Sequence, residues 1–366
     1  MTETLHPIET LLTTRRTVVC LGPGGVGKTT TSAALALRAA GLGRKTLVLT
    51  VDPAHRLANS LGLDRFDNDE QEISRERFEA AGVPYVAPLY AMMLDTKRVF
   101  DDIVERYAPN PEVRSRILAS PFYKEASTRL AGSQEYMAME KLYALLQERR
   151  YDLIVLDTPP TVHALDFLDA PGRLEEFMTL GDDGLAAKGG RALGRLGLGF
   201  LRANTAILKG AGKFLGADVF TDILSFIGDF QTMYAGFRDR AAAVKRFMRS
   251  DEIAFLVITG PERASIDEGL FLRERLVADR MPFASFLVNR TRLPVDDAGP
   301  LEDETPEVLA ALRHAAERMG VLAARDAREL ARLDKALGHQ ALRIPESADD
   351  ICALRDLHRY AGTVLA

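Results

Sequence analysis

The chain has 366 residues, 47% of them hydrophobic and 27% charged, which is enough for one large α/β domain or two ordinary ones. The formal net charge of −5 argues against a dedicated nucleic-acid binder, because such proteins usually carry a basic excess. The two cysteines, Cys20 and Cys352, lie far apart in the sequence and fit a reducing compartment. No uncharged apolar stretch is long enough to span a membrane, and residues 1–14 lack the apolar core of a signal peptide. We therefore expect a cytoplasmic protein that binds no nucleic acid.

Short apolar runs predict the strands of a buried sheet. They cover residues 17–21, 46–50, 153–156, 254–258 and 283–288, and a sixth run covers 89–94. Each run lies near a helical pattern, which is typical of a parallel sheet with helices on both faces. The sequence therefore predicts an α/β fold of the P-loop NTPase kind, with a doubly wound and mainly parallel sheet.

Two long intervals between these runs predict helical insertions. They span about residues 95–150 and about 172–250, and the second contains a helical pattern over 220–249. An interval of this length is too long for a single crossover between parallel strands. No internal repeat is evident. We expect one ATPase domain, residues 1–366, in which the insertions form a helical subdomain.

The first predicted strand is followed by a glycine-rich loop with P-loop spacing. The run GPGGVGKT matches GxxxxGK[ST], and a helix of small and apolar residues follows over 30–40. The N–H groups of such a loop and the helix N-terminus face phosphates, while Lys28 would neutralise the β and γ oxygens and act in catalysis. The hydroxyl of Thr29 would bind Mg²⁺. The predicted nucleotide contacts in this region are Gly22, Gly24, Gly25, Val26, Gly27, Lys28, Thr29 and Thr30.

An acidic residue, Asp52, directly follows the second predicted strand in the run VDPAHR. A carboxylate at the carboxyl end of a parallel strand lies over the crevice where ligands bind. Asp52 is therefore a candidate to activate the attacking water and to contact Mg²⁺ through water. The alternative is that Asp52 caps a helix over 54–61.

Two more polar residues end predicted strands. Asp157, in the run LDTPPT, follows the strand at 153–156, which is the Walker-B arrangement for holding Mg²⁺ directly or through water. Asn289 closes the strand at 283–288, and its amide offers the donor and the acceptor that match the adenine edge. An Asx turn at the end of the strand is the alternative for Asn289. No NKxD or TKxD guanine signature occurs there, so the sequence favours ATP over GTP.

In combination, these motifs resemble those of the ArsA-type ATPases, a family that includes arsenite-pump ATPases and the eukaryotic ATPase that delivers tail-anchored membrane proteins. The resembling runs are GPGGVGKTTT, DPAHRLANSLGL, LAGSQEYMAMEKLY, LDTPPTVHALDFLDAP, TGPERASIDE and VNRTRLP. The resemblance implies a homodimeric ATPase with nucleotide near the interface. By the same resemblance, Asp52 is the water-activating residue of switch I, residues 157–161 form switch II and Asn289 contacts adenine.

The sequence departs from the family pattern in three places. Pro23 stands where the family's P-loop usually has a lysine that reaches the partner subunit, and Arg56 is our first candidate to replace that charge. Cys20 and Cys352 are too few for a three-thiol arsenite site within one subunit. The zinc-clasping CxxC of the eukaryotic targeting ATPase is absent, so a homodimer would form by packing or through nucleotide.

Residues 184–216 predict a surface for a partner. They carry six basic residues and no acid among many apolar ones. Basic amphipathic segments favour anionic membranes or apolar partner helices, and in the related targeting ATPase the helices inserted at this place form the client groove. We expect a hydrophobic or membrane-protein client over 184–250, with at most peripheral membrane contact. The alternative is a helical excursion packed on its own domain.

An apolar stripe with helical spacing runs from Ile351 to Val364 near the C-terminus. It is predicted to close the core, with a membrane-targeting helix as the alternative. For the whole chain, the leading hypothesis is an ATPase whose hydrolysis drives conformational change for a client. The alternatives are the catalytic subunit of an arsenite or anion pump, and a nucleotide switch with little hydrolysis.

Overall fold

The computed structural model describes residues 6–51, 56–61, 63, 69–121, 123–124, 133–159, 229, 232–292 and 305–364. The chain divides into two compact units, which are described separately below. The first unit comprises Met1–Leu94, Ala144–Leu165 and Phe247–Ala366, and the second comprises Asp95–Tyr143 and Asp166–Arg246. The assignment of a single domain with two insertions stays a prediction.

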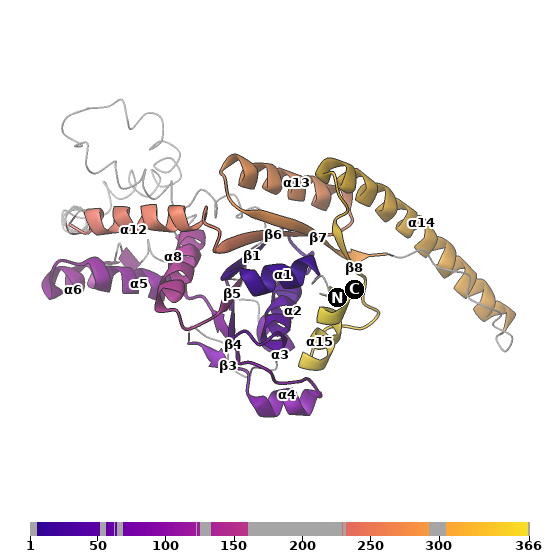
Figure 1. Ribbon diagram of the computed structural model, residues 1–366, viewed down its shortest axis with the longest axis horizontal. Helices are drawn as coiled ribbons and strands as arrows, with labels where there is room; N and C mark the ends of the chain where they lie inside the picture. Colours follow the sequence, from indigo (N-terminus) through magenta and orange to yellow (C-terminus); the bar gives the residue numbers. More distant parts are fainter. Residues whose placement is uncertain are drawn as a thin grey trace, which may run out of the picture. The chain divides into compact units, whose positions relative to one another are not determined.

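A sheet forms the centre of the first unit (Figure 1). Among the described residues it has eight strands, in the order β3-β4-β2-β5-β1-β6-β7-β8. Neighbouring strands are parallel, apart from the antiparallel pair β3 and β4. The predicted α/β fold with a mainly parallel sheet is confirmed. The strands are β1 (Thr17–Leu21), β2 (Thr46–Thr50), β3 (Gln71–Glu72), β4 (Leu89–Met93), β5 (Leu153–Asp157), β6 (Ile253–Thr259), β7 (Phe283–Thr291) and β8 (Leu342–Pro345).

The six predicted strands are present. The bounds of β4, β5 and β6 differ from the prediction by one residue, and the larger differences lie in the edge strands and at the end of β7. β3 and β8 were missed because they are short edge strands without a continuous apolar run, QE and LRIP. β7 continues to Thr291, three residues beyond the predicted end. Asn289 and Arg290 therefore belong to β7 itself rather than to the turn after it, and both can contact the segments beside β7.

One face of the sheet is covered by a layer of helices built around α2. This layer contains α1 (Pro7–Thr14), α2 (Lys28–Gly41), α3 (Arg56–Leu61), α4 (Arg75–Ala81) and α15 (Leu354–Thr363). The apolar side chains of these helices share one buried cluster with inward residues such as Val18, Val155 and Ile258. The run of small residues in α2, including Ala33, Ala34 and Ala36, is fully buried, so this helix lies between the sheet and α15.

The other face of the sheet is covered by α13 (Arg263–Ala278), and Figure 1 shows α13 and α14 (Pro306–Leu337) across the sheet from α2. A Cβ placed on Gly269 of α13 would lie 2.8 Å from the Phe286 ring and 3.4 Å from Val257. Val257 and Phe286 face α13, whereas their neighbours in the strands, Leu256 and Leu287, belong to the cluster around α2. Successive side chains of a strand point to opposite faces of the sheet. Both faces are covered, in agreement with the prediction.

The C-terminal stripe closes the core, as predicted. Leu354, Leu357, Ala361 and Val364 are buried in the cluster around α2, and Ile351 packs against it. The alternative of a membrane-targeting helix is not supported, because this apolar face is already covered. Within the described part of the chain, no helix combines the length and the apolar character needed to cross a membrane.

The described part of the second unit is helical. It contains α5 (Thr96–Tyr107), α6 (Pro111–Ala119), the first part of α8 (Ser133–Glu148) and most of α12 (Tyr234–Phe247). Within this unit, buried Glu140 of α8 pairs with Arg240 of α12 at 2.8 Å, and the Arg240 guanidinium lies 4.3 Å from the centre of the Tyr143 ring. The predicted client segment 184–216 lies outside the described residues.

Candidate nucleotide site

The glycine-rich loop leaves the carboxyl end of β1 and enters α2, and close approach explains two of its glycines. A Cβ on Gly22 would lie 1.8 Å from the carbonyl oxygen of Ile258 in β6. A Cβ on Gly27 would lie 2.5 Å from Nδ2 of Asn289, and the backbone of Gly27 is left-handed, with φ of 89°. Only glycine fits both positions without displacing the neighbour. The loop is thus pressed against β6 and β7.

The ammonium group of Lys28 is held inside this loop. Its Nζ donates hydrogen bonds to the carbonyl oxygens of Gly22, at 2.9 Å, and Pro23, at 2.8 Å. The residue is only 7% exposed, although lysine is rarely buried without partners. Lys28 is also the first residue of α2, so its charge lies beside the positive end of a helix. An anion is the ligand that this concentration of positive charge would attract.

A buried carboxylate lies at the end of the neighbouring strand. Asp157 of β5 is paired in register with Cys20 of β1 and with Thr50 of β2, and it is fully buried. Its Oδ2 accepts a 2.9 Å hydrogen bond from Oγ1 of Thr50. The site therefore places a carboxylate beside the strand from which the phosphate loop leaves.

The donors of this region fit Mg²⁺. Thr29, in the first turn of α2, offers a half-buried hydroxyl, and Asp157 offers carboxylate oxygen, which are hard donors of the kind that Mg²⁺ prefers. The described residues contain no group of three His, Cys, Asp or Glu side chains that could hold a metal ion by themselves. Mg²⁺ in protein sites commonly takes one or two carboxylates and completes its shell with phosphate oxygens and water. This donor set therefore suits a Mg²⁺ ion carried with a nucleotide.

The asparagine predicted to contact adenine is bonded to the phosphate loop. Nδ2 of Asn289 donates to the carbonyl oxygen of Val26 at 2.9 Å, and Oδ1 accepts from the Tyr360 hydroxyl, at 2.9 Å, and from the N–H of Arg290, at 3.0 Å. Both lone pairs of Oδ1 are thus engaged, so a contact with adenine would use an amide N–H of Asn289. The adenine contact stays a prediction.

Two residues of this site, Tyr360 and Arg290, were missed at the level of sequence. The Tyr360 hydroxyl bridges Asn289 and Thr31, which lies 3.0 Å away, and Nη1 of Arg290 donates to the carbonyl oxygen of Gly25 at 3.0 Å. The only signal for Tyr360 was a tyrosine within an apolar stripe, since a buried hydroxyl needs a partner. The partner itself is remote in sequence and was not predictable from spacing.

Cys20 lies beneath the loop as a neutral thiol. Its pKa is raised to about 12, mainly by burial; the charge of Asp157 also raises it, while a hydrogen bond with Ser32 and the charge of Lys28 lower it. The thiolate is the form that binds soft metal and metalloid ions, so this thiol is a poor ligand. Cys352 is exposed on the loop before α15. The sequence-based argument against an arsenite site within one subunit is consistent with these surroundings.

Comparison with known proteins places this loop in a family. The family model of anion-transporting ATPases, ArsA ATPase, matches residues 15–185. That segment contains the phosphate loop, Asp52 and Asp157. Residues 15–185 are of the ArsA type. The resemblance seen in the sequence is confirmed over this segment.

Individual relatives agree with the ArsA assignment. "ATPase GET3" of Malassezia globosa is 33% identical over 162 residues, which cover 44% of each chain. "Putative arsenical pump-driving ATPase" of Halobacterium salinarum is 32% identical over 187 residues, or 49% of this chain and 27% of the relative. "ATPase get3" of Schizosaccharomyces pombe is 25% identical over 282 residues, or 76% of this chain and 74% of the relative. The chain thus spans less than half the length of the first two relatives.

The ArsA resemblance also singles out Asp52 and Arg56, which lie after β2. Asp52 lies outside the described residues, although the preceding Val51 donates its N–H to the carbonyl oxygen of Asp157 at 3.2 Å. Arg56 begins α3, and its side chain lies outside the description. The roles of Asp52 as water activator and of Arg56 as the replacement cation stay predictions. Pro23 is buried in the loop and carries no charge.

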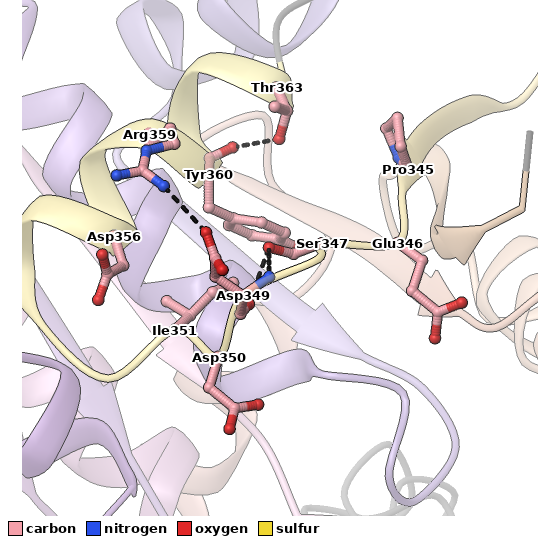
Figure 2. A pocket seen from close by; sticks show the side chains of 10 residues that line it. All are labelled: Pro345, Glu346, Ser347, Asp349, Asp350, Ile351, Asp356, Arg359, Tyr360 and Thr363. Atoms are coloured by element: carbon pink, nitrogen blue, oxygen red, sulfur yellow. Dashed lines mark hydrogen bonds and ion pairs between the residues drawn. The ribbon is translucent and has the colours of Figure 1, made fainter. Parts of the chain in front are cut away.

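A hollow lies beside Tyr360, between the loop that follows β8 and helix α15 (Figure 2). Its described wall is rich in acids, namely Glu346, Asp349, Asp350 and Asp356, and the lining residue Arg359 is paired with Asp349 at 3.3 Å. An acidic wall repels phosphate, so this hollow is a separate feature from the phosphate loop. Tyr360 lines this hollow and also reaches Asn289 beside the phosphate loop.

Proposed function

We propose that this chain is a Mg²⁺-dependent ATPase of the ArsA type, which converts ATP and water to ADP and phosphate in the cytoplasm. Hydrolysis would drive a conformational change by which the protein handles a hydrophobic or membrane-protein client. The observation that carries the proposal is the Lys28 ammonium group, held inside the glycine loop next to the strand that ends in buried Asp157. Sites of phosphoryl transfer combine a cation, a helix N-terminus and a carboxylate, and here these groups lie at the carboxyl ends of neighbouring strands.

Each element has a part in the proposed reaction. The loop N–H groups bind the phosphates, and Lys28 leaves the carbonyl oxygens of Gly22 and Pro23 for the β and γ oxygens, which are stronger acceptors because they are charged. Thr29 and Asp157 would hold Mg²⁺, which neutralises charge on the phosphates when bound. Asp52 would orient the attacking water. The adenine base would be selected by Asn289.

The proposed coupling runs through the segments that follow β2 and β5. Asp157 and Thr158 connect the metal site to residues 159–161, and Thr158 is anchored by a 2.7 Å hydrogen bond from its hydroxyl to the carbonyl oxygen of Cys20. Loss of the γ-phosphate would release these segments, in the manner of nucleotide switches. The client would bind over residues 184–250, whose sequence is basic and apolar, and the working form would be a homodimer.

Steady-state phosphate release with saturating ATP and Mg²⁺ tests the proposal. We expect turnover by the native chain, loss of turnover and of tight ATP binding in Lys28→Ala, and unchanged turnover in Lys335→Ala, which removes an exposed lysine of α14. Asp52→Asn should keep ATP binding and lose most hydrolysis. Turnover in Lys28→Ala equal to that of the native chain would overturn the assignment of the site, and unchanged turnover in Asp52→Asn would remove Asp52 from its role.

The same assay separates two alternatives. Tight ATP binding without measurable phosphate release by the native chain would favour a nucleotide switch over an ATPase. The anion-pump alternative draws support from the name of the Halobacterium salinarum relative. It predicts that arsenite or antimonite stimulates hydrolysis and that the stimulation disappears when Cys20 and Cys352 are both replaced. The buried neutral thiol of Cys20 argues against that outcome.

A further inference from the structure

Strand β7 is irregular at the point where it passes the phosphate loop. Arg290 has a φ of 58°, a left-handed conformation that costs free energy for any residue with a side chain. The pairing of β7 with β8 shifts register between Val288 and Thr291, as at a β-bulge. Bulges re-aim side chains that a regular strand would direct elsewhere. Strain of this kind persists where the surrounding structure or the function requires it.

The irregularity directs two successive side chains to one loop. Asn289 donates to the carbonyl oxygen of Val26 at 2.9 Å, and Arg290 donates to the carbonyl oxygen of Gly25 at 3.0 Å. The N–H of Arg290 also donates to Oδ1 of Asn289, so the two residues support each other. The buried Asn289 already holds the loop in place. The second bond to the loop comes from Arg290, which is strained and charged. Because Asn289 already holds the loop, this bond indicates a role for the charge of Arg290.

The position of Arg290 suits a ligand. Arg290 and Gly25 are both exposed, so their contact lies on the open side of the loop, whereas Lys28 is buried on the inner side. Loop residues 22–27 contain no charged side chain of their own. Lys28 and Arg290 share one arrangement, in which a cationic head is bonded to neutral carbonyl oxygens of the loop. A phosphate oxygen is a stronger acceptor than a carbonyl oxygen, because it is charged.

We propose that Arg290 is a second cationic residue of the nucleotide site, which exchanges the Gly25 carbonyl oxygen for a phosphate oxygen of the bound nucleotide. Asn289 keeps its bond to Val26 during this exchange, so the loop retains its shape while the guanidinium changes partner. The inference rests on the proposed nucleotide-binding function. It adds to that function a specific source of charge on the open side of the loop.

Calorimetric titration of the full chain with Mg²⁺ and either ATP or ADP tests this inference. Arg290→Gln keeps a hydrogen-bond donor and removes the charge, whereas Arg290→Lys keeps the charge, and both carry a similar backbone cost. Arg280→Gln is the matched control, because Arg280 is also an exposed arginine with a φ of 58° but lies at the end of α13. We expect about 10-fold weaker ATP binding in Arg290→Gln, at most about 3-fold in Arg290→Lys and no change in Arg280→Gln.

The salt dependence separates a charged contact from a structural one. Affinity for ATP should fall less steeply with NaCl in Arg290→Gln than in the native chain, because one ionic contact is missing. Native affinity and native salt dependence in Arg290→Gln would overturn the inference, and so would equal weakening in the glutamine and lysine variants, which would indicate a role in loop shape alone. Failure of the native chain to bind nucleotide, or binding by Lys28→Ala as tight as native, would instead overturn the proposed function on which the inference rests.

Discussion

The hydroxyl of Tyr360 donates a 2.9 Å hydrogen bond to Oδ1 of Asn289, and Nδ2 of the same asparagine donates to the phosphate loop at Val26. Because the Tyr360 proton is used in this bond, the 3.0 Å contact with Thr31 is donated by the threonine. The chain of bonds runs from Thr31 of α2 through Tyr360 of α15 and Asn289 of β7 to the loop. Helix α15 is thereby tied to the nucleotide site through buried polar groups, which act cooperatively when all are satisfied.

Replacing Tyr360 with phenylalanine should weaken nucleotide binding. The ring keeps its packing, but Asn289 loses one donor, and Thr31 loses its acceptor, so the asparagine is held less firmly against Val26. We expect about 3- to 10-fold weaker ATP binding and a loss of about 1 kcal/mol in the free energy of unfolding. Both are measurable by calorimetric titration and urea unfolding.

A control in α15 separates the loss of the Tyr360 hydrogen bond from a general loss of stability of this helix. Leu357→Ala empties core space in α15, at a cost of about 2–5 kcal/mol in stability, without touching the chain of hydrogen bonds. Its affinity for ATP should stay close to native under conditions where it is folded. If Tyr360→Phe binds ATP as the native chain does, or if Leu357→Ala weakens binding equally, the bond to Asn289 has no special role in the site.

Gly27→Ala should abolish tight nucleotide binding, and Gly43→Ala should not. Both glycines are left-handed, with φ of 89° and 87°, so both substitutions carry the conformational cost of about 1–2 kcal/mol. At Gly43 the new methyl group meets nothing within 4 Å, whereas at Gly27 it meets Nδ2 of Asn289 at 2.5 Å. The clash displaces Asn289 from Val26. Equal ATP affinities of the two variants, measured by titration, would contradict this account of the loop.

Asp157→Asn should impair Mg²⁺-dependent hydrolysis more than ATP binding. The amide has nearly the shape of the carboxylate but lacks its charge, so we expect at least a roughly 100-fold loss of turnover and a higher Mg²⁺ requirement. Thr50→Val keeps the carboxylate and removes the 2.9 Å hydrogen bond that orients it, for which about a 10-fold loss is expected. Phosphate release measured across a Mg²⁺ series tests both. Native Mg²⁺ dependence in Asp157→Asn would exclude this residue from the metal site.

Stability should fall as the pH rises above about 9. Burial raises the pKa of Cys20 from 9.0 to about 12 and that of Tyr360 from 10.0 to about 12. The unfolded chain loses these protons first, so it is favoured between the unfolded and folded pKa values. Urea unfolding from pH 8 to 11 should show this decline, with a smaller slope in Cys20→Ala. A slope that is identical in Cys20→Ala would mean that this thiol does not contribute.

The short apolar runs were sufficient to predict the six inner strands of the sheet. Runs such as 17–21 and 153–156 are buried on both faces, so nearly all their residues are apolar, and this pattern can be recognised in the local sequence. Edge strands are different. Gln71–Glu72 and Leu342–Pro345 pair with one neighbour each and need no continuous apolar run, so only the folded sheet reveals them.

The candidate site also combines features that the local sequence predicts with features that only the folded chain reveals. The phosphate loop and Lys28 are local features, because glycines, a lysine and a helix start within eight residues determine how the backbone presents itself to an anion. The sequence by itself therefore determined the α/β fold, the loop and the Walker-B position of Asp157. Tertiary structure decided that Asn289, Arg290 and Tyr360 meet this loop. Hydrogen bonds across 71 and 263 residues depend on how strands and helices pack in space, and no local spacing encodes them.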